Sequence, residues 1–138
     1  DLVRAMRKVQ GQSTSCPGSV SQAAAVAALN GPQDCVEDMR LAFRERYDFM
    51  YEALNRLPGV SCPTCDGAFY VFPSFEDFIE DHADIRDDTE LATWMLEEAG
   101  VSTVPGSAFG APGHLRLSYA ASMDYLQDAI ARMTRAMA

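Results

Sequence analysis

Apolar residues recur every three or four positions in several stretches of this chain, which is the spacing of one face of a helix. The longest such stretch predicts a helix over residues 33–57, with an apolar stripe formed by Val36, Met39, Phe43, Tyr47, Met50, Leu54 and Leu57. Shorter stretches predict helices over residues 2–10, over residues 88–99 and from Ser122 to the end of the chain. An alanine-rich helix over residues 19–30 is also predicted, because Ser19 and Gln22 form a capping-box pattern at its start.

Strict alternation of apolar and polar residues predicts one strand, over residues 114–119. Its two sides are expected to carry Leu115, Leu117 and Tyr119 on one face and His114, Arg116 and Ser118 on the other. Shorter apolar segments predict strands near Val60 and over residues 68–72 and 101–104, and the first two are expected to form a hairpin. The expected fold class is therefore α+β, with a small, mainly antiparallel sheet of three to four strands covered by helices.

Charge and composition narrow the classes of partner. The net charge of −9 at pH 7 argues against nucleic acid, because phosphate binding needs clustered lysines and arginines. No run approaches the roughly 18 apolar residues of a membrane span, so we expect no membrane partner and a cytoplasmic location. Eight of the 20 acidic residues lie between positions 76 and 90, where we predict a solvated connection that ends in a helix cap at Asp87. This segment lacks the ligand alternation of a calcium-binding EF-hand loop.

Cys62 and Cys65 have the spacing of a redox motif or of half a zinc site. A thioredoxin-type redox site would lie at the N-terminus of a helix, whereas Pro63 and Gly67 here favour a turn between strands. A zinc site would need a second pair of ligands, and neither histidine of the chain has a neighbour at ligand spacing. We therefore interpret the two cysteines as reduced thiols on a turn and expect no bound metal, with a redox or zinc protein as an alternative hypothesis.

Arg116 is the candidate binding residue that the pattern singles out. It lies mid-strand on the polar side of the alternating segment, after a glycine-rich loop and beside Ser118. A guanidinium is a planar fork that matches a carboxylate bidentately, which the ammonium of lysine cannot do. The sequence lacks paired-histidine metal motifs, nucleophile elbows and phosphate-binding loops. On these grounds Arg116 could equally be an ordinary exposed arginine of a strand. A stand-alone α+β ligand-binding or regulatory domain is therefore an open alternative.

Four segments carry a family resemblance, in an order that spans essentially the whole chain. They are residues 12–17 together with 19–22, then 67–72 (Gly-Ala-Phe-Tyr-Val-Phe), 101–110 (Val-Ser-Thr-Val-Pro-Gly-Ser-Ala-Phe-Gly) and 113–120 (Gly-His-Leu-Arg-Leu-Ser-Tyr-Ala). Each segment has little specificity by itself, but together they resemble the class I aminotransferases of the aspartate aminotransferase type. The resemblance implies a fold type I transferase that moves an amino group between an amino acid and a 2-oxo acid, with pyridoxal 5'-phosphate (PLP) as cofactor.

The resemblance also implies roles for particular residues. Arg116 matches the arginine that binds the α-carboxylate of the substrate, and Phe69 matches an aromatic residue that lines the active site near that carboxylate. A loop at the dimer interface, near the partner subunit's cofactor pocket, is matched by Ser13, Thr14, Ser15 and Cys16. Aspartate is the expected amino acid. Aromatic and other amino acids stay open, because residues 9–12 lack the arginine with which some members bind a distal carboxylate.

By the same resemblance, residues 1–31 are expected to be interdomain and interface helices with a loop, following a PLP-binding large domain. Residues 32–138 are expected to be the C-terminal small domain, and the partners are that large domain and a second subunit of a homodimer. Lys8 is the only lysine, and it does not match the lysine that forms the Schiff base, which the family places before residue 1. No catalytic residue is therefore assigned within the chain, and the isolated chain is expected to bind no PLP and to be inactive.

Overall fold

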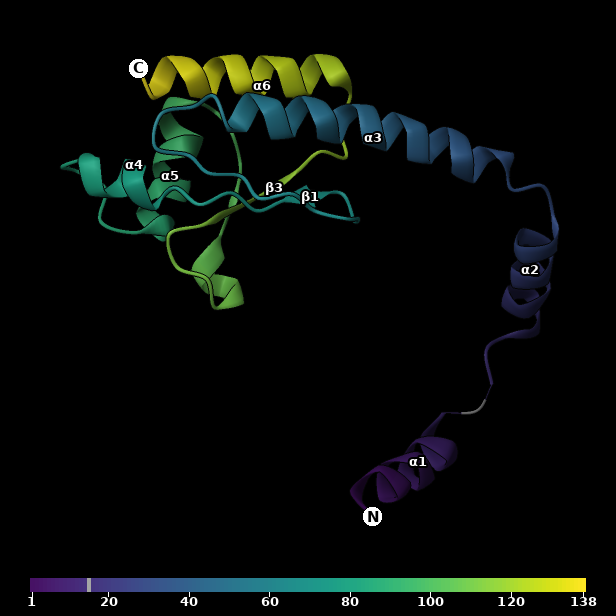
Figure 1. Cartoon of the computed structure of the whole chain (residues 1–138). Coiled ribbons are helices and arrows are strands. Elements are labelled where there is room, and N and C mark those ends of the chain that lie inside the picture. Colours follow the sequence, from purple (N-terminus) through teal and green to yellow (C-terminus); the bar gives the residue numbers. More distant parts are fainter. Residues whose placement is uncertain (15) are drawn as a thin grey trace. The chain divides into compact units, whose positions relative to one another are not determined.

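A computed structural model describes residues 1–14 and 16–138 of the chain (Figure 1). Internal contacts divide the chain into two units, Asp1–Asp38 and Met39–Ala138, and the boundary between them falls within helix α3 (Asp34–Leu54). Throughout these described residues, no helix combines the length and the apolarity that crossing a membrane requires.

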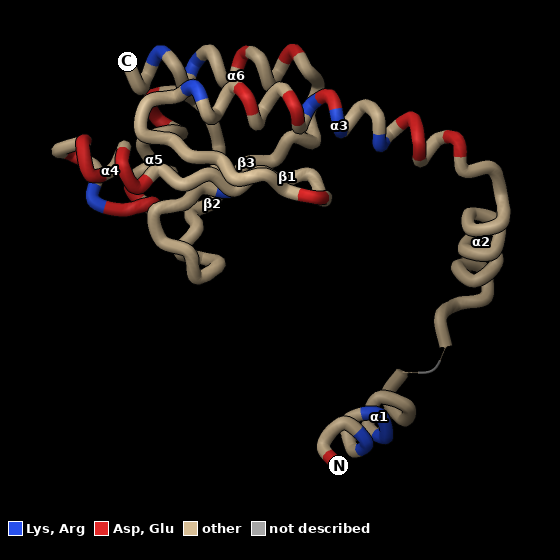
Figure 2. The backbone as a smooth tube through the Cα atoms, in the orientation of Figure 1, with Lys and Arg blue, Asp and Glu red and all other residues tan. Residues whose placement is uncertain are grey.

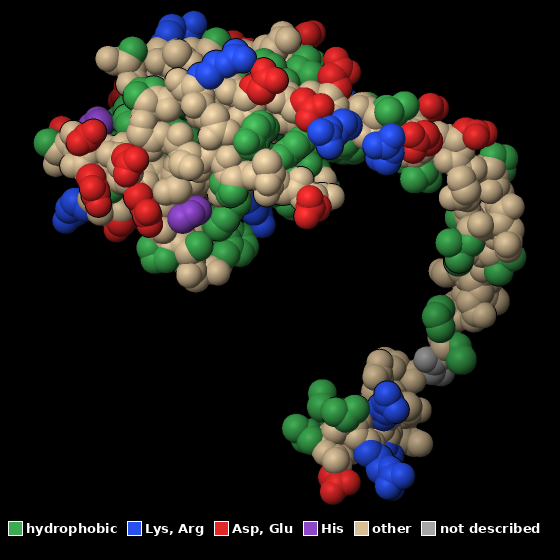
Figure 3. Space-filling model, in the orientation of Figure 1, with side chains coloured by type: hydrophobic (Ala, Val, Ile, Leu, Met, Phe, Trp, Pro, Cys, Tyr) green, Lys and Arg blue, Asp and Glu red, His purple; other side chains and the backbone are tan. Residues whose placement is uncertain are grey.

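The first unit begins with helix α1 (Leu2–Ser13). The predicted end of this helix at residue 10, just before Gly11, is wrong, because the helix continues to Ser13 and the backbone N–H of Thr14 still donates to the carbonyl of Gln10 at 2.8 Å. A glycine inside a helix costs only about 1 kcal/mol relative to alanine, so it does not have to end one. No residue of α1 is buried, and apolar side chains cover one side of this helix while its basic side chains lie on another (Figure 3).

Helix α2 (Ser19–Asn30) starts where the sequence predicted, but its cap differs from the prediction. Gly18, not Ser19, is the N-cap residue, and no side chain caps the helix. The side-chain amide of Gln22 instead donates to the carbonyl of Pro17 at 2.7 Å. The side chain of Gln22 therefore holds Pro17, the residue before the cap. No residue of α2 is buried.

The second unit contains a three-stranded antiparallel sheet, which confirms the expected α+β fold class. Its strands are β1 (Tyr70–Val71), β2 (Val104–Pro105) and β3 (Leu115–Ser118), in the spatial order β1-β3-β2. The register pairs Tyr70 with Ser118, Val71 with Leu117, Val104 with Arg116 and Pro105 with Leu115. The strand predicted from strict alternation, β3, is therefore the central strand and contacts both others.

The predicted strand near Val60 is wrong. Ser61 makes a single isolated bridge with Ser74, through backbone hydrogen bonds of 3.0 and 2.8 Å. The next residue, Cys62, bonds to a side chain instead of a strand: Asn55 accepts from its N–H at 2.9 Å and donates to its carbonyl at 3.1 Å. Since the side chain of Asn55 satisfies this backbone, the ladder cannot continue, and β1 finds its strand partner in β3.

Helices of the second unit surround the sheet. Besides the part of α3 in this unit, they are α4 (Glu76–Asp81), α5 (Asp88–Glu98), the short 3-10 helix η1 (Gly106–Phe109) and α6 (Met123–Ala136). The most deeply buried large side chains are Phe75, Met50, Leu54, Leu91, Met95, Leu115, Met133 and Val71. They come from α3, α5, α6, two strands and, for Phe75, the residue just before α4, so one core joins the helices to the sheet. Ser122 caps α6 as predicted, accepting from the N–H of Tyr125 at 3.4 Å.

Helix α4 lies in the acidic segment that was predicted to be a solvated connection, and this part of the prediction is wrong. Acidic residues do gather along α4 and the approach to α5 (Figure 2). Phe78, however, is only 9% exposed and attaches α4 to the core, with Phe75 fully buried just before it. Asp88 is also buried, at 2% exposed. The high number of acidic residues suggested a solvated segment, although Phe75, Phe78 and Asp88 are buried.

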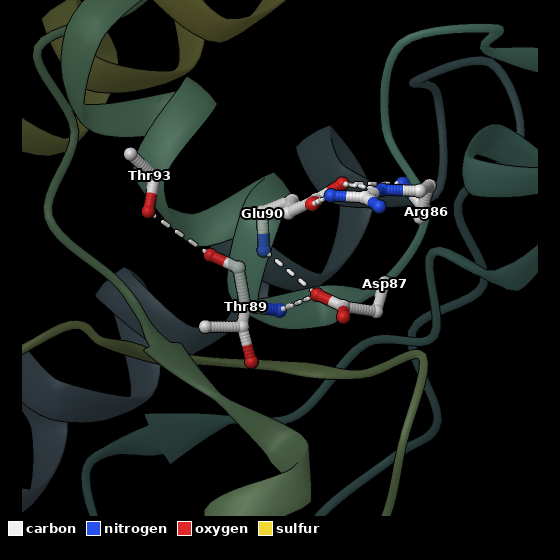
Figure 4. Close-up of polar contacts among 5 residues, drawn as sticks. All are labelled: Arg86, Asp87, Thr89, Glu90 and Thr93. Atoms are coloured by element: carbon white, nitrogen blue, oxygen red, sulfur yellow. Dashed lines mark hydrogen bonds and ion pairs between the residues drawn. The ribbon is translucent and has the colours of Figure 1, made fainter.

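The start of α5 confirms the predicted cap (Figure 4). The carboxylate of Asp87 accepts hydrogen bonds from the N–H groups of Thr89 at 2.9 Å and Glu90 at 2.8 Å. Glu90 reaches back to the backbone N–H of Arg86 at 2.9 Å and also pairs with the guanidinium of Arg86. Asp87 therefore satisfies two free N–H groups of the helix, and Glu90 fixes the residue before the cap.

Candidate functional site

Arg116 lies in the middle of the central strand β3. Its neighbours Leu115 and Leu117 are 0% and 5% exposed and face the core. Because side chains alternate along a strand, Arg116 projects from the opposite face of the sheet, where it is half-buried. The side assigned to Arg116 from the sequence is therefore confirmed.

Two aromatic rings contact the guanidinium of Arg116. Its Cζ atom lies 4.5 Å from the ring centroid of Tyr70 and 4.7 Å from that of Phe109. Cation–π contacts of this kind contribute about 0.5–2 kcal/mol each and restrict the side chain. The guanidinium forms no ion pair with any residue that the structure describes. The guanidinium is thus held in place while its hydrogen-bond donors are left for an external acceptor.

The rings around Arg116 belong to an aromatic cluster on this face, formed by Tyr70, Phe72, Phe109 and His114. Phe109 meets Phe72 edge to face at a centroid distance of 6.1 Å, and Phe72 stacks on His114 at 5.3 Å. Tyr70 and Phe72 come from the segment of β1, while His114 and Arg116 alternate with the buried leucines of β3. The cluster therefore surrounds the polar side of the central strand with apolar surface, which strengthens the interaction of a charged group with its partner.

Phe109 lies in a tight loop formed by residues 106–113 (the 106–113 loop), which brings its ring to the cluster. The N–H of Gly106 donates to the carbonyl of His114 at 2.7 Å, and the N–H of Ala111 donates to the carbonyl of Gly106 at 3.0 Å. A Cβ atom on Gly106 would lie 2.7 Å from the Cβ of His114 and would also collide with the carbonyl of Ala111. Only glycine fits here, so the Pro-Gly pair of the sequence fixes how the loop leaves β2.

Asp88 fastens the same loop to helix α5. Its carboxylate accepts from the backbone N–H of Ser107 at 2.7 Å and from the Ser107 hydroxyl. Burial opposes the charge of Asp88, but hydrogen bonds from Ser107, from the backbone of Asp88 itself and from that of Gly113 outweigh it. The pKa of Asp88 is therefore held below its ordinary value. Asp88 is thus an ionised carboxylate that is joined to the start of the loop at Ser107.

Phe69 lies one ring away from the guanidinium. It is 42% exposed, and its ring centroid is 4.3 Å from that of Tyr70, which in turn contacts Arg116. Tyr119 holds the backbone here: its N–H donates to the carbonyl of Phe69 and its hydroxyl to the carbonyl of Ala68, each at 2.9 Å. Ala68 has a positive φ of 65°, which this pair of bonds helps to maintain. Phe69 and Arg116 therefore share Tyr70 as a neighbour, and the ring of Phe69 also lies 6.4 Å from that of Phe43 in α3.

The residues expected to form an interface loop lie in the first unit. Ser13 is the last residue of α1, and its hydroxyl donates to the carbonyl of Val9 at 2.9 Å. Thr14 caps the helix end and donates its hydroxyl to the carbonyl of Gln10 at 3.0 Å. Cys16 is exposed, and Ser15 lies outside the described residues. The predicted polar loop therefore begins after Ser13, because two hydroxyls bond back to the last turn of the helix.

The two cysteines of the turn are held in different environments. Cys62 is 4% exposed, and burial together with the charge of Cys65 raises the pKa of its thiol to about 11. Cys65 is half-buried, and its backbone N–H donates to the hydroxyl of Tyr47 at 3.1 Å. Reactive redox cysteines have lowered pKa values, so the environment of Cys62 is that of a structural thiol. In the described parts of the chain, no three His, Cys, Asp or Glu side chains are grouped closely enough to hold a metal ion.

The residues of this chain do not fit a PLP site. PLP attaches to a lysine amine in a desolvated pocket, and the only lysine here, Lys8, is exposed on α1, a helix without buried residues. The second unit carries instead the guanidinium of Arg116, which lies against two aromatic rings.

Comparison with known proteins identifies the family. The family model described as "Aminotransferase class I and II" matches residues 1–133. The chain therefore belongs to the class I and II aminotransferase family, and the family resemblance seen in the sequence is confirmed.

Individual relatives agree with this assignment. The chain is 45% identical over 137 residues to the aspartate aminotransferase of Geobacillus stearothermophilus, covering 99% of this chain and 35% of that protein. The crystal structure of the aspartate aminotransferase from Rhizobium meliloti matches with a TM-score of 0.87 at 41% identity, over 99% of this chain and 35% of the other. The aromatic aminotransferase of Pyrococcus horikoshii matches with a TM-score of 0.82 at 35% identity, over 96% and 35%. The chain thus spans about a third of the length of these relatives.

Sequence reasoning missed three residues that shape this surface. Tyr70 and Phe109 lie within the segments that carry the resemblance, but no role was predicted for either. Which ring contacts Arg116 depends on strand register and loop shape, which periodicity does not specify. Asp88 was counted among the solvated acids, although its position at the start of a predicted helix, near the Pro-Gly loop in space, makes it a bonding partner.

Proposed function

We propose that this chain is the C-terminal, carboxylate-binding part of a PLP-dependent aminotransferase, in which Arg116 binds the α-carboxylate of the amino acid. The observation that carries this proposal is the guanidinium of Arg116, which lies against Tyr70 and Phe109 and has no carboxylate partner in the described chain. A planar donor fork that is held by aromatic rings and lacks an internal partner is suited to bind a carboxylate through two parallel hydrogen bonds.

Such a pair orients the substrate as well as binding it. Two parallel hydrogen bonds fix the plane of the carboxylate and so the direction of the bonds at the α-carbon, which is the main entropic benefit of a positioned reactant. The aromatic cluster keeps water from part of the guanidinium, and the ion pair is stronger in this lower dielectric. Phe69, next to Tyr70, extends the apolar surface against which the rest of the amino acid lies.

In our proposal, PLP is bound by a part of the intact protein that lies outside this chain. The relatives are about three times as long as the chain, and Lys8 is exposed on a helix surface. PLP supplies the electron sink of amino transfer when it is bound. The lysine that holds it would come from the other part of the protein, so the isolated 138-residue chain is proposed to be inactive.

The first unit supports the proposal of interfaces with that other part and with a second subunit. In α1, the apolar side chains of Leu2, Val3, Met6 and Val9 are between 61% and 76% exposed. An isolated helix of this length is marginal in water, and a continuous apolar stripe marks a surface that another protein surface covers. We propose that residues 1–31 make these interdomain and dimer contacts, that the loop with Ser13, Thr14, Ser15 and Cys16 belongs to the dimer interface, and that residues 32–138 form the small domain.

Aspartate is the amino acid that we propose first, with the corresponding 2-oxo acid as product and a cytoplasmic location. The names of the relatives support this choice, although one of the matching structures is an aromatic aminotransferase. The chain carries the site for the α-carboxylate that all amino acids share. The choice among side chains therefore depends on groups outside Arg116 and its rings.

The test is an amino-transfer assay on the intact polypeptide that carries this chain, with PLP supplied. Aspartate, tyrosine and alanine are offered in turn as donors to 2-oxoglutarate, and glutamate formation is measured. We expect transfer from at least one donor, fastest from aspartate, and none from the isolated chain under the same conditions. A folded intact protein with no bound-cofactor absorbance and no transfer from any donor refutes the proposal and leaves a ligand-binding domain without catalysis as the better account.

A further inference from the structure

Asp88 lies outside the surface around Arg116, but the 106–113 loop joins the two. We infer that Asp88 is a positioning residue for substrate binding: by holding Ser107 it fixes the loop that sets the ring of Phe109 against the guanidinium of Arg116. The inference rests on the proposed function of Arg116 and adds a second residue on which the affinity for a carboxylate depends.

The chain of contacts is short and continuous. The carboxylate of Asp88 accepts both the backbone N–H of Ser107, at 2.7 Å, and its hydroxyl. Both bonds tie the first turn of the loop to one point on α5, and the backbone of Gly113, at the other end of the loop, also favours the charged form of Asp88 and so helps to lower its pKa. Phe109 lies two residues after Ser107, within the same helical turn η1, and its ring centroid is 4.7 Å from the Cζ atom of Arg116.

The ring of Phe109 has little else to hold it. Phe109 is 52% exposed, so burial does not fix its position. Its contacts are the guanidinium and the edge of Phe72, at 6.1 Å between centroids. Inside the loop, the N–H of Gly110 donates to the carbonyl of Ser107 at 3.1 Å, and this bond shapes the turn without attaching it to the rest of the domain. Two contacts attach this end of the loop: the N–H of Gly106 donates to the carbonyl of His114, and Ser107, the residue nearer to Phe109, is held by Asp88.

Helix capping does not account for Asp88. The free N–H groups at the start of α5 are already bonded to Asp87, which accepts from Thr89 and Glu90 (Figure 4). A buried carboxylate is costly unless it is fully hydrogen-bonded, and here the bonds that offset the cost come mainly from the loop. The place of Asp88 at a helix N-terminus favours its charge, which makes it a firm anchor for the loop.

The experiment measures the binding of maleate, a dicarboxylate without an amino group, to the intact, PLP-loaded protein by the change in cofactor absorbance. Asp88→Asn keeps the shape of the side chain but weakens its bonds to Ser107. We expect the dissociation constant for maleate to rise roughly two- to thirtyfold, the range for residues that modulate binding without contacting the ligand. With aspartate as donor, KM is expected to rise by more than kcat falls.

Asp87→Asn is the matched control. It removes the same charge from the adjacent position of the same helix end, and asparagine is as good an N-cap as aspartate. Since Asp87 bonds only within α5, this variant is expected to bind maleate as the unchanged protein does. Equal losses of affinity in the two variants would mean that charge or helix stability, not the loop, is responsible.

A double-mutant cycle tests whether Asp88 affects maleate affinity through the position of the Phe109 ring. If Asp88 acts by placing Phe109, then Asp88→Asn adds little further loss of maleate affinity in a Phe109→Ala background. Additive losses overturn the inference. Should Asp88→Asn fail to fold, Ser107→Ala removes the hydroxyl bond alone and is expected to show a smaller loss of the same kind.

Failure of the inference differs from failure of the proposed function. If the unchanged protein binds maleate and Arg116→Ala does not, while Asp88→Asn binds as tightly as the unchanged protein, only the role of Asp88 is refuted. If the unchanged protein and Arg116→Ala bind maleate equally well, the role of Arg116 itself is refuted.

Discussion

Tyr70 and Arg116 are diagonal neighbours on one face of the sheet, and the guanidinium Cζ of Arg116 lies 4.5 Å from the ring centroid of Tyr70. The register explains this contact, because Tyr70 pairs with Ser118, which shares a face of β3 with Arg116. The strand pairing therefore builds the support under the guanidinium. Neither residue alone shows this relationship in the sequence.

The face of the Tyr70 ring, not its hydroxyl, makes this contact. Tyr70→Phe is therefore expected to leave amino-acid affinity of the intact protein nearly unchanged. Tyr70→Leu is expected to weaken it by about 0.5–2 kcal/mol, the worth of one cation–π contact. Dissociation constants for the two variants decide the matter, and a larger loss for Tyr70→Phe than for Tyr70→Leu would show that the hydroxyl matters instead.

The thiol of Cys62 is expected to be the slowest of the cysteines to react in the folded chain. It is 4% exposed and its pKa is raised to about 11. Compared with an ordinary thiol of pKa near 8.5, it should react with iodoacetamide near pH 8 on the order of a hundredfold more slowly. Mass spectrometry of the native chain over time provides the measurement, with the exposed Cys16 and Cys35 as internal references. Rapid modification of Cys62 would revive the redox hypothesis.

The contribution of Asp88 to stability is expected to depend on pH. Its pKa in the folded chain is below the ordinary value, so the ionised form stabilises the fold. This stabilisation is fully present above the pKa of the unfolded chain, near 3.9, and is lost as the pH falls through the lower pKa of the folded state. The difference in free energy of unfolding between the unchanged chain and Asp88→Asn should thus be largest near neutral pH. Urea unfolding at several pH values measures it, and a difference that stays constant down to about pH 3 contradicts the prediction.

The parts of the fold with strong local signals could be predicted from the sequence. Alternation around Leu115 and Leu117 put Arg116 on the correct face of its strand, and Asp87 marked the start of α5. The prediction for the acidic segment was wrong because it rested on the number of charged residues. The burial of a single aromatic side chain, Phe78, is what packs α4 against the core.

The surface around Arg116 was predictable only in part. Arg116 and Phe69 could be named from the resemblance; the structure places Arg116 against the aromatic cluster, and Phe69 contacts that cluster only through its neighbour Tyr70. The contacts of Phe109 and Asp88 with their partners depend on how the 106–113 loop folds back onto α5, which involves residues distant in the sequence. Periodicity describes which side of an element faces the core, and it contains no information on such pairings.

The central claim is that Arg116 binds the α-carboxylate of an amino acid, and its most direct test is the dissociation constant of the intact protein for aspartate. Arg116→Ala is expected to weaken binding by about 2–4 kcal/mol, as for the loss of a charge-assisted bidentate pair, and Arg116→Lys by a smaller amount. Arg56→Ala is the control, since Arg56 is exposed and pairs with Glu52 on the surface of the domain at 2.9 Å. The account predicts a large loss for Arg116→Ala and none for Arg56→Ala, and an unchanged dissociation constant for Arg116→Ala would contradict it.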